Sequence, residues 1–225
     1  MTSSAARAEL ESLLRARKLD VTLTSAAPWT DRTRDVSPTG IATLDAALGG
    51  GLARGQLAEV VGPRSSGRTT IVCRMLAAAA ARGEAVAMVD ACDRFDPASA
   101  EAAGLDLGKL LWVRDTGDAP RALKAVNLVL QAGGFGLVVF DVADVPGRAL
   151  RQFPYTTWMR IARVIEGSQT TAVIVAAERL ARSPGGVTIA LDGDATLQRA
   201  RWTGTTDRAR LFRGIDVQPR VVGGR

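Results

Sequence analysis

Apolar residues form short continuous runs that alternate with stretches of helical periodicity between residues 36 and 178. Continuous apolar runs are typical of strands buried on both faces, and apolar residues at three- or four-residue spacing indicate helices that cover them. We expect strands at residues 56–61, 85–89, 110–113, 137–140 and 172–177. We expect helices at residues 41–48, 69–82, 97–103, 119–132 and 158–165. This alternation predicts an α/β fold with a mainly parallel, twisted sheet flanked by helices.

The two ends of the chain show a different pattern. Residues 4–18 carry leucines at helical spacing, residues 21–24 favour a short strand, and residues 25–35 are polar and predict a linker. We therefore expect two parts, an N-terminal segment at residues 1–35 and a core at residues 36–225. The end of the core predicts an antiparallel β extension of one sheet edge, with strands at residues 195–202, 209–216 and 218–222.

Composition narrows the class of protein. The chain has 225 residues, of which 47% are hydrophobic and 23% charged, as in ordinary globular domains. No run of 18 or more apolar residues occurs, and the charged N-terminus lacks the apolar region of a secretory signal. We therefore expect no contact with membranes. Because there are only two cysteines, we expect a reduced, cytoplasmic setting. The absence of histidine excludes a Ser-His-Asp triad and a histidine zinc site.

Positive charge is concentrated near the C-terminus. The net charge is +6, and residues 195–225 hold seven arginines against two aspartates. A basic segment of this kind is typical of contact with nucleic acid or with an acidic partner. Because arginine supplies nearly all of the basic residues, a compositional bias of the genome is an equal alternative.

The strongest chemical signal is the stretch G-P-R-S-S-G-R-T-T at residues 62–70, between a predicted strand and a predicted helix. Glycines at this position let backbone N–H groups surround a phosphate, and the helix N-terminus adds positive potential. The stretch follows the pattern G-x-x-x-x-G-K-[ST], except that Arg68 replaces the lysine. The alternative is a glycine- and serine-rich turn without a ligand. The candidate nucleotide-binding residues are Gly62, Arg64, Ser65, Ser66, Gly67, Arg68, Thr69 and Thr70.

A second feature completes a phosphate site. The apolar run at residues 137–140 ends in Asp141, and a carboxylate at the end of such a strand is typical of the Mg²⁺ side of nucleotide-binding sites. We expect the Thr69 hydroxyl and Asp141 to be the residues that hold Mg²⁺. The alternative is a capping aspartate at the end of a strand.

These motifs together resemble the ATPase core of the RecA recombinase over residues 36–225. Residues 62–70 are similar to its G-P-E-S-S-G-K-T-T, and residues 37–49 are similar to its S-T-G-S-L-S-L-D-x-A-L-G. Residues 89–97 align with I-D-A-E-H-A-L-D-P, and residues 105–116 follow in register. The resemblance implies a RecA-like fold that binds ATP with Mg²⁺, with Asp96 beside the adenine. It also implies that residues 1–35 dock a second subunit or a partner.

The chain departs from the RecA pattern where that family hydrolyses ATP. Cys92 stands where the resemblance places the water-activating glutamate, and Ala177 stands where it places the glutamine that senses the γ-phosphate. Gly223 stands at the position of a lysine that reaches the neighbouring subunit's ATP, and Arg68 replaces the phosphate-loop lysine. Since each lost group commonly costs orders of magnitude in rate, we expect hydrolysis to be slow or absent.

A shortened RecA core with a basic end is similar to ImuA, the RecA-like accessory protein of bacterial inducible-mutagenesis cassettes. That resemblance implies a role in translesion synthesis during the response to DNA damage (SOS response). The implied partners are a Y-family polymerase-like protein and an error-prone replicative-type polymerase. RecA, single-stranded DNA and a second copy of the chain are further partners to consider. The candidate residues for nucleic acid or partner contact are Arg148, Arg151, Arg182, Arg199, Arg201 and Arg213.

Two other functions stay open on the residues alone. An active DNA-dependent ATPase that forms filaments on single-stranded DNA would need a carboxylate near the γ-phosphate, and Asp93 and Asp144 are the candidates. A scaffold without nucleotide would result if Arg68 paired with Asp141, because that ion pair would replace the ligand's charge and exclude Mg²⁺.

Overall fold

The protein has the α/β architecture that the sequence predicts. The computed structural model describes residues 35–181, 186–191, 199–203, 211–216 and 219–222. Seven strands form the main sheet in the order β11-β8-β3-β7-β6-β4-β5, and every neighbouring pair is parallel except β11 and β8. The predicted helix and strand of the N-terminal segment lie outside the described residues. No helix in the described ranges has the length and apolar character needed to cross a membrane.

The elements follow the predicted order. The strands of the main sheet are β3 (Leu57–Val61), β4 (Ala85–Asp90), β5 (Leu110–Arg114), β6 (Phe135–Asp141), β7 (Thr171–Ala176), β8 (Thr188–Ala190) and β11 (Arg220–Val222). The helices are α2 (Ala42–Ala47), α3 (Arg68–Ala81), α4 (Pro97–Ala102), α5 (Ala119–Ala132), α6 (Gly147–Leu150) and α7 (Tyr155–Ile165). A short 3₁₀ turn, η2 (Leu107–Lys109), precedes β5, and a two-stranded ribbon joins β1 (Val36–Ser37) to β2 (Leu52–Ala53).

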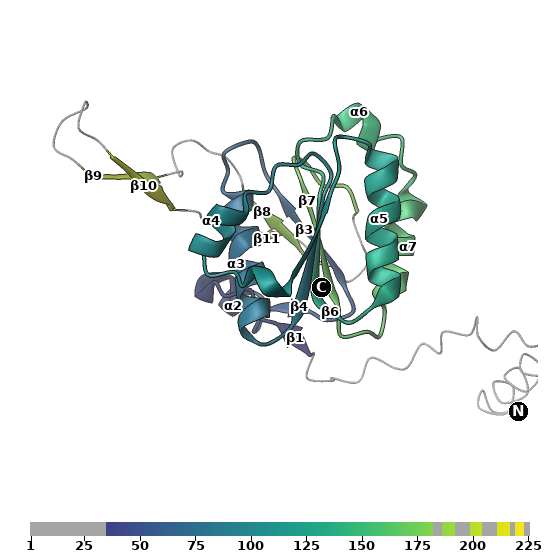
Figure 1. The fold of residues 1–225 in the computed structure, drawn as a ribbon, viewed down its shortest axis with the longest axis horizontal. Helices are drawn as coiled ribbons and strands as arrows, with labels where there is room; N and C mark the ends of the chain where they lie inside the picture. The colour runs from purple at the N-terminus through teal and green to yellow at the C-terminus, as the bar shows by residue number, and fades with distance from the viewer. Residues whose placement is uncertain (1–34, 182–185, 192–198, 204–210, 217–218, 223–225) are drawn as a thin grey trace, which may run out of the picture. The chain divides into compact units, whose positions relative to one another are not determined.

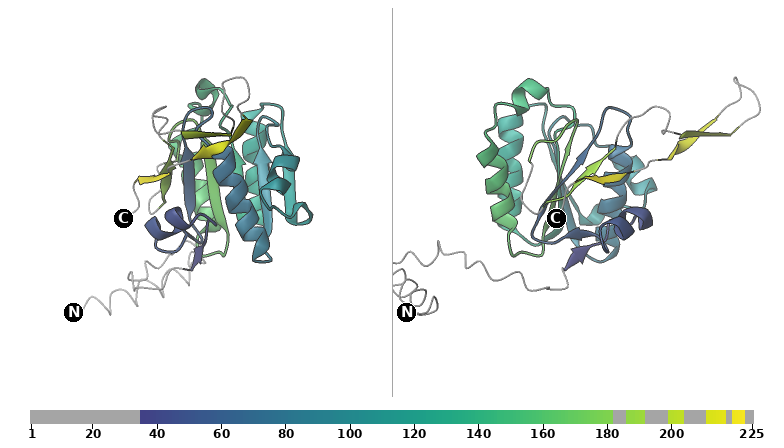
Figure 2. Two further views of the ribbon diagram at one scale, coloured as in Figure 1. Left: turned by 90° about the vertical axis from the view of Figure 1, so that its left-hand side faces the viewer. Right: turned by 180° about the vertical axis from the view of Figure 1, so that it is seen from behind.

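Helices cover both faces of the main sheet. Helices α2, α3 and α4 lie on one face, and α5 and α7 lie on the other, which the views from the front and from behind show alike (Figures 1 and 2). Alternating strand residues serve the two layers, since Val139 of β6 packs in the cluster that includes α3, whereas Val138 and Phe140 pack in the cluster that includes α5 and α7. The sheet is therefore buried on both sides, as its continuous apolar runs predict.

Local capping explains where two of the helices begin. Asp118 accepts a hydrogen bond from the Arg121 backbone N–H at the start of α5, where a proline occupies the first turn. Asp96 does the same for the Ser99 backbone N–H at the start of α4, which also begins with a proline. Both helices start at the residues that these capping signals indicate.

The C-terminal β segments differ from the expected extension. Only β11 joins the main sheet, where it pairs antiparallel with β8. Strands β9 (Arg199–Thr203) and β10 (Leu211–Asp216) instead pair with each other in a separate two-stranded sheet. The expected antiparallel extension of a sheet edge is therefore confirmed for β11, whereas the expectation that the two preceding strands join this edge is wrong, because β9 and β10 pair with each other. The sequence reasoning also missed β8, a three-residue strand that lies between β3 and β11.

A buried carboxylate connects β3 to the segment that follows β7. Glu59 is 3% exposed, and its Oε1 atom accepts hydrogen bonds from the backbone N–H groups of Leu180 at 2.8 Å and Ala181 at 2.7 Å. Its other oxygen lies 3.4 Å from the Thr188 hydroxyl. Because a buried carboxylate is costly unless it is hydrogen-bonded, these contacts explain how a charged residue is accommodated in a central strand.

Candidate phosphate and magnesium site

The loop between β3 and α3 is built for close backbone approach. All five residues of β3 are buried, and the loop begins at Gly62 directly after the strand and turns at residues 64–65. A Cβ atom on Gly62 would lie 2.6 Å from the Leu191 carbonyl oxygen and 2.6 Å from the Ser66 hydroxyl, so no larger residue fits there without movement. Ser65 and Gly67 both have positive φ, at 62° and 93°, which folds the loop back toward the strand. This curled backbone is the form that a phosphate-binding loop requires.

The N-terminus of α3 is left without a side-chain cap. Gly67 occupies the capping position and makes no side-chain hydrogen bond, unlike Asp96 and Asp118 at the starts of α4 and α5. The helix is 14 residues long, so its first N–H groups carry a substantial positive potential. The buried Ser66 hydroxyl, one residue earlier, has no hydrogen-bond partner in the part of the chain that the structure describes. Uncapped N–H groups beside an orphaned hydroxyl fit an anionic ligand such as phosphate.

Arg68 does not form the ion pair with Asp141 that the scaffold alternative requires. Its side chain is largely buried, with 9% exposure, and Nη1 donates a hydrogen bond of 2.8 Å to the Gly62 carbonyl oxygen. No ion pair between Arg68 and Asp141 occurs among the described residues. The long guanidinium therefore bonds to the first residue of its own loop, so the observation that would favour a nucleotide-free scaffold is lacking.

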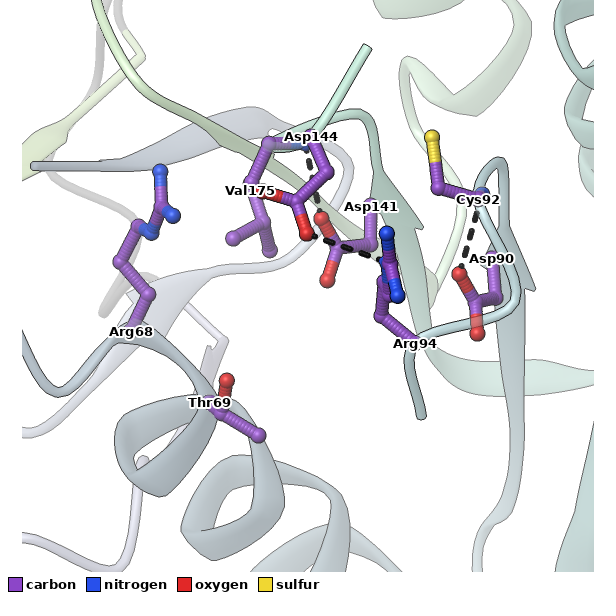
Figure 3. Close-up of a pocket in the computed structure, with 9 residues that line it drawn as sticks. Arg68, Thr69, Asp90, Cys92, Arg94, Asp141, Asp144 and Val175 are labelled. Atoms are coloured by element: carbon purple, nitrogen blue, oxygen red, sulfur yellow. Dashed lines mark hydrogen bonds and ion pairs between the residues drawn. The ribbon is translucent and has the colours of Figure 1, made fainter. Parts of the chain in front are cut away.

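The loop opens onto a small pocket at the carboxyl ends of the parallel strands (Figure 3). The pocket encloses about 50 Å³. Its lining comes from the start of α3 and from the ends of β4, β6 and β7, which are brought together because parallel strands end at one edge of the sheet. The lining residues are Arg68, Thr69, Asp90, Cys92, Arg94, Asp141, Ala143, Asp144 and Val175.

Thr69 and Asp141 line this pocket together, as the sequence predicts. Burial raises the pKa of the Asp141 carboxyl to about 6, with a further contribution from the nearby Asp90 charge, although the carboxylate accepts a hydrogen bond of 2.9 Å from the Ala143 N–H. A half-buried, poorly compensated carboxylate in the same pocket as an exposed threonine fits a divalent cation, because Mg²⁺ is held by one or two protein oxygens, waters and phosphate. No group of three or more acidic or cysteine side chains in the described ranges could hold a metal ion by itself.

Cys92 lines the same pocket, and no glutamate does. Burial raises the pKa of the Cys92 thiol, and the charges of Asp144, Asp90 and Asp141 raise it further. The thiol is therefore neutral at ordinary pH and is a poor base for water. Among the described residues near Cys92, each pocket carboxylate already has a hydrogen-bond or ion-pair partner. None is therefore free to replace the glutamate of the RecA pattern.

The aspartates near Cys92 are all engaged. Asp90 is buried and accepts hydrogen bonds from the backbone N–H groups of Cys92 and Phe95. Asp93 accepts two hydrogen bonds from Arg114, which lower its pKa, and it is absent from the pocket lining. Asp144 does line the pocket, where it forms an ion pair with Arg94 (Figure 3).

Comparison with known proteins follows the same motifs. The sequence model of the family described as the RecA N-terminal domain matches residues 24–150, which is more than half of the chain. The chain belongs to the RecA family. The match includes the phosphate loop, Cys92 and Asp141, and it ends before β7 and the C-terminal strands.

RecA relatives match this chain over about half of its length. Protein RecA of Methylococcus capsulatus is 44% identical over 109 residues, which are 48% of this chain and 31% of that protein. Protein RecA of Thermus thermophilus is 42% identical over 117 residues, which are 50% and 34% of the two chains. The chain therefore spans about a third of the length of the curated relatives that it matches.

A solved structure supports the fold. The crystal structure of the RadB recombinase is similar with a TM-score of 0.54 at 18% sequence identity. The similarity covers 69% of this chain and 83% of that one. At this level of identity the likeness concerns the arrangement of strands and helices, and it agrees with the RecA-like α/β core.

Other predicted site residues of this RecA-family chain lie apart from the pocket. Asp96, expected beside the adenine, caps α4 and also accepts from the Ser99 hydroxyl. Arg148 lies on α6 and is exposed, and Arg151 at the end of α6 forms an ion pair of 3.3 Å with Glu178. Ala177, at the expected position of the γ-phosphate sensor, is exposed directly after β7.

The remaining predicted contacts are only partly described. Arg182 and Gly223 lie outside the described residues. For Arg199, Arg201 and Arg213 the structure describes the backbone in β9 and β10.

Sequence reasoning missed Arg94 as a pocket residue. Arg94 lines the pocket from the loop after β4, two residues beyond Cys92, where the RecA pattern quoted above has alanine. An arginine at this departure from the family pattern was the available signal. Asp90 was missed as well, and its place at the end of an apolar strand resembles that of Asp141.

Proposed function

We propose that this protein is a nucleotide-binding RecA-family accessory factor in DNA damage-induced mutagenesis, with weak or absent ATP hydrolysis. One observation carries the proposal. Thr69 and Asp141 line one pocket at the uncapped start of α3, an arrangement that fits phosphate and Mg²⁺, whereas a neutral Cys92 thiol stands where hydrolysis would need a free carboxylate.

The residues on the binding side have clear tasks in this proposal. The Thr69 hydroxyl and the Asp141 carboxylate would hold Mg²⁺, and the uncapped N-terminus of α3 would bind phosphate oxygens. A bound Mg²⁺ would supply positive charge that neutralises the phosphates. Arg68 would keep the phosphate loop folded through its hydrogen bond to Gly62.

Slow turnover follows from two replaced side chains, of which one lines the pocket and one lies outside its lining. Removing one oriented group from an active site commonly lowers the rate by about 10²–10³. In this chain the glutamate and the γ-phosphate sensor are both replaced, by Cys92 and Ala177. Nucleotide would therefore remain bound and control assembly, rather than drive strand exchange.

The proposed cellular role rests on the resemblance to ImuA. In this reading the protein assembles or regulates an error-prone polymerase complex for translesion synthesis, with a Y-family polymerase-like protein and an error-prone replicative-type polymerase. The segment between β6 and β7 holds only α6, α7 and their connecting turns, which leaves little chain for a DNA-binding loop. Residues 1–35 and the basic C-terminal segment would contact the partners, a second copy or single-stranded DNA.

An active recombinase is the second candidate. The observation that favours it is Asp144, a carboxylate that lines the pocket close to Cys92. If Asp144 left its arginine partners and activated water, the protein would be a DNA-dependent ATPase that forms filaments on single-stranded DNA. In the ligand-free state Asp144 is engaged in ion pairs with Arg64 and Arg94, which disfavours that role.

A deletion experiment in the organism that carries the gene separates the two functions. The accessory role predicts that deletion abolishes the rise in mutation frequency after DNA damage and leaves recombination frequency unchanged. Wild-type chain should restore mutagenesis, whereas Thr69→Ala should not. Loss of recombination with intact induced mutagenesis would contradict the proposal and favour the recombinase.

A further inference from the structure

Asp144 lies between two arginines at the pocket. The Arg64 Nε atom lies 3.5 Å from Asp144 Oδ1, and the Arg94 Nε atom lies 3.4 Å from Asp144 Oδ2. Each carboxylate oxygen therefore has its own arginine. The close-up shows the Arg94 side chain directed at Asp144 beside Asp141 (Figure 3).

The three residues come from three loops. Arg64 belongs to the phosphate loop after β3, Arg94 to the loop after β4, and Asp144 to the loop after β6. Strands β3 and β4 are not neighbours in the sheet, because β7 and β6 lie between them. Asp144 thus joins two loops that the sheet alone would keep apart, and it does so beside the predicted phosphate site.

The two ion pairs of Asp144 can be replaced by contacts with a ligand. The side chains of Arg64 and Arg94 are 80% and 65% exposed, and Asp144 is 23% exposed. Each arginine approaches through Nε, and in the described part of the chain neither has another ion pair. Exposed ion pairs contribute little to stability, so their loss on ligand binding costs little.

Charge decides which ligand would displace Asp144. Asp90, Asp141 and Asp144 line the pocket against the cations Arg68 and Arg94, and Arg68 is bonded to Gly62. The guanidinium groups of Arg64 and Arg94 are therefore the cations that remain for an incoming anion. A terminal phosphate offers three oxygens and more negative charge than a carboxylate, so it is the stronger partner for a planar guanidinium.

We propose that Asp144 is a built-in competitor that holds Arg64 and Arg94 until a nucleoside triphosphate enters, and that Arg94 then binds the terminal phosphate. This inference rests on the proposed function, because it requires nucleotide at the phosphate loop. Arg94 becomes the residue that distinguishes a triphosphate from a diphosphate, in a chain whose expected sensor position is Ala177, outside the pocket lining. The exchange frees the loop after β6 from the loops after β3 and β4 when triphosphate is bound.

Calorimetry with two nucleotides tests this exchange. Affinities of Mg²⁺ with ADP and with a non-hydrolysable ATP analogue are measured for wild type, Arg94→Ala, Asp144→Asn and Arg160→Ala. Arg160 is an exposed arginine on α7, the helix layer on the opposite face of the sheet from α3, so Arg160→Ala is a control for loss of one charge.

The expected results have opposite signs. Arg94→Ala lowers the affinity for the triphosphate analogue about 10-fold and leaves ADP within about 2-fold, because a charge-assisted contact is lost from the terminal phosphate alone. Asp144→Asn raises the triphosphate affinity about 3- to 10-fold, since the competitor loses its charge. Arg160→Ala leaves both affinities unchanged.

Two results overturn the inference. An equal loss of affinity for both nucleotides in Arg94→Ala, or weaker triphosphate binding in Asp144→Asn, makes the three residues a static structural clamp. If Arg94→Ala does not fold, Asp144→Asn alone still gives the decisive sign. Failure of wild type to bind ADP contradicts the proposed function itself, whereas ADP binding without these opposite effects contradicts only this inference.

Discussion

The two sides of the pocket have diverged in different ways. On the side of the phosphate loop, Gly62 allows close backbone approach and Thr69 and Asp141 line the pocket together, an arrangement that fits the proposed binding of phosphate and Mg²⁺. On the side of β4, Cys92 lines the pocket where the RecA pattern has a glutamate, and no free carboxylate among the described residues stands beside it. Ala177, exposed after β7 and outside the pocket lining, stands where the pattern has the γ-phosphate sensor. Strands β4 and β6 pair in parallel and end beside each other, so the contrast between Cys92 and Asp141 is one of side chains.

This difference indicates that binding and turnover are separable properties of one fold. Binding depends on backbone N–H groups, a helix N-terminus and two oxygen ligands, which survive as long as the loop keeps its shape. Turnover depends on single oriented side chains, each of which can be lost without unfolding the protein. A chain that keeps the first set and loses the second can still use nucleotide as a signal.

The largest effect is expected from Gly62→Ala on the binding side. The new Cβ would lie 2.6 Å from the Leu191 carbonyl oxygen, so the loop must shift away from its phosphate-binding form. We expect a loss of nucleotide affinity of about 100-fold and a destabilisation of about 1–3 kcal/mol. Calorimetry and urea unfolding measure the two effects.

Gly108→Ala serves as the matched control. Its new Cβ would meet only a side-chain oxygen of Asp106 at 3.1 Å, and Gly108 has no positive φ. It should leave both quantities nearly unchanged. If Gly62→Ala binds nucleotide as wild type does, the loop is not the phosphate site.

A smaller effect is expected from Thr69→Ala. The side chain is exposed, so stability should stay within about 0.5 kcal/mol. The affinity for ATP in the presence of Mg²⁺ should fall about 10- to 100-fold, because a ligand oxygen is lost. Thr69→Ser keeps the hydroxyl and should restore binding. Equal affinities of wild type and Thr69→Ala in Mg²⁺ would remove Thr69 from the metal site.

Asp141→Asn should stabilise the ligand-free protein at neutral pH. The native pKa is about 6 and the unfolded value is about 4, so the native state binds more protons in this window and wild-type stability falls as pH rises through it. The variant avoids this cost and should be about 1–2 kcal/mol more stable at pH 7.5, with no gain below pH 4.

The same variant should lose stabilisation by Mg²⁺ with nucleotide. Thermal unfolding with and without this ligand checks both parts of the prediction. A variant that is less stable than wild type at pH 7.5 would show that the Asp141 charge has a better partner than the structure indicates.

The smallest effect is expected from Cys92→Ala, in the loop after β4 where the glutamate of the RecA pattern is replaced. Since the thiol pKa is raised, the group is neutral from pH 6 to 8 and contributes no base. Nucleotide affinity and residual turnover should stay within about 2-fold of wild type, with no thiol-dependent step in the pH profile. A marked loss of turnover would identify Cys92 as a catalytic residue and break the distinction between the two sides.

Local signals predicted much of the fold. Helix α5 spans the residues expected from its pattern, because Asp118 and a proline define its start and Gly133 its end. Strand β8 was not predicted because three residues give almost no periodicity. Strands β9 and β10 were placed wrongly because strand pairing depends on partners that propensity does not reveal, whereas β11 lies at the sheet edge as expected.

The candidate site was predictable in part for a similar reason. Thr69 and Asp141 follow motifs that are contiguous in sequence, so their meeting at the pocket could be expected. The Arg64–Asp144–Arg94 cluster joins three loops, and no local pattern states which side chains of different loops will face each other. The pairing of Arg68 with Asp141, which only the scaffold alternative required, does not occur among the described residues; the guanidinium donates to the Gly62 carbonyl oxygen instead.

The most direct test of the central claim is to measure ATP binding and ATP hydrolysis on the same preparation. Calorimetry with ATP and Mg²⁺ gives the affinity, and phosphate release with and without single-stranded DNA gives the rate. We predict Mg²⁺-dependent binding with turnover near background under both conditions. Rapid turnover that single-stranded DNA stimulates would contradict the account, because it would mean that another group, such as Asp144, has replaced the missing glutamate.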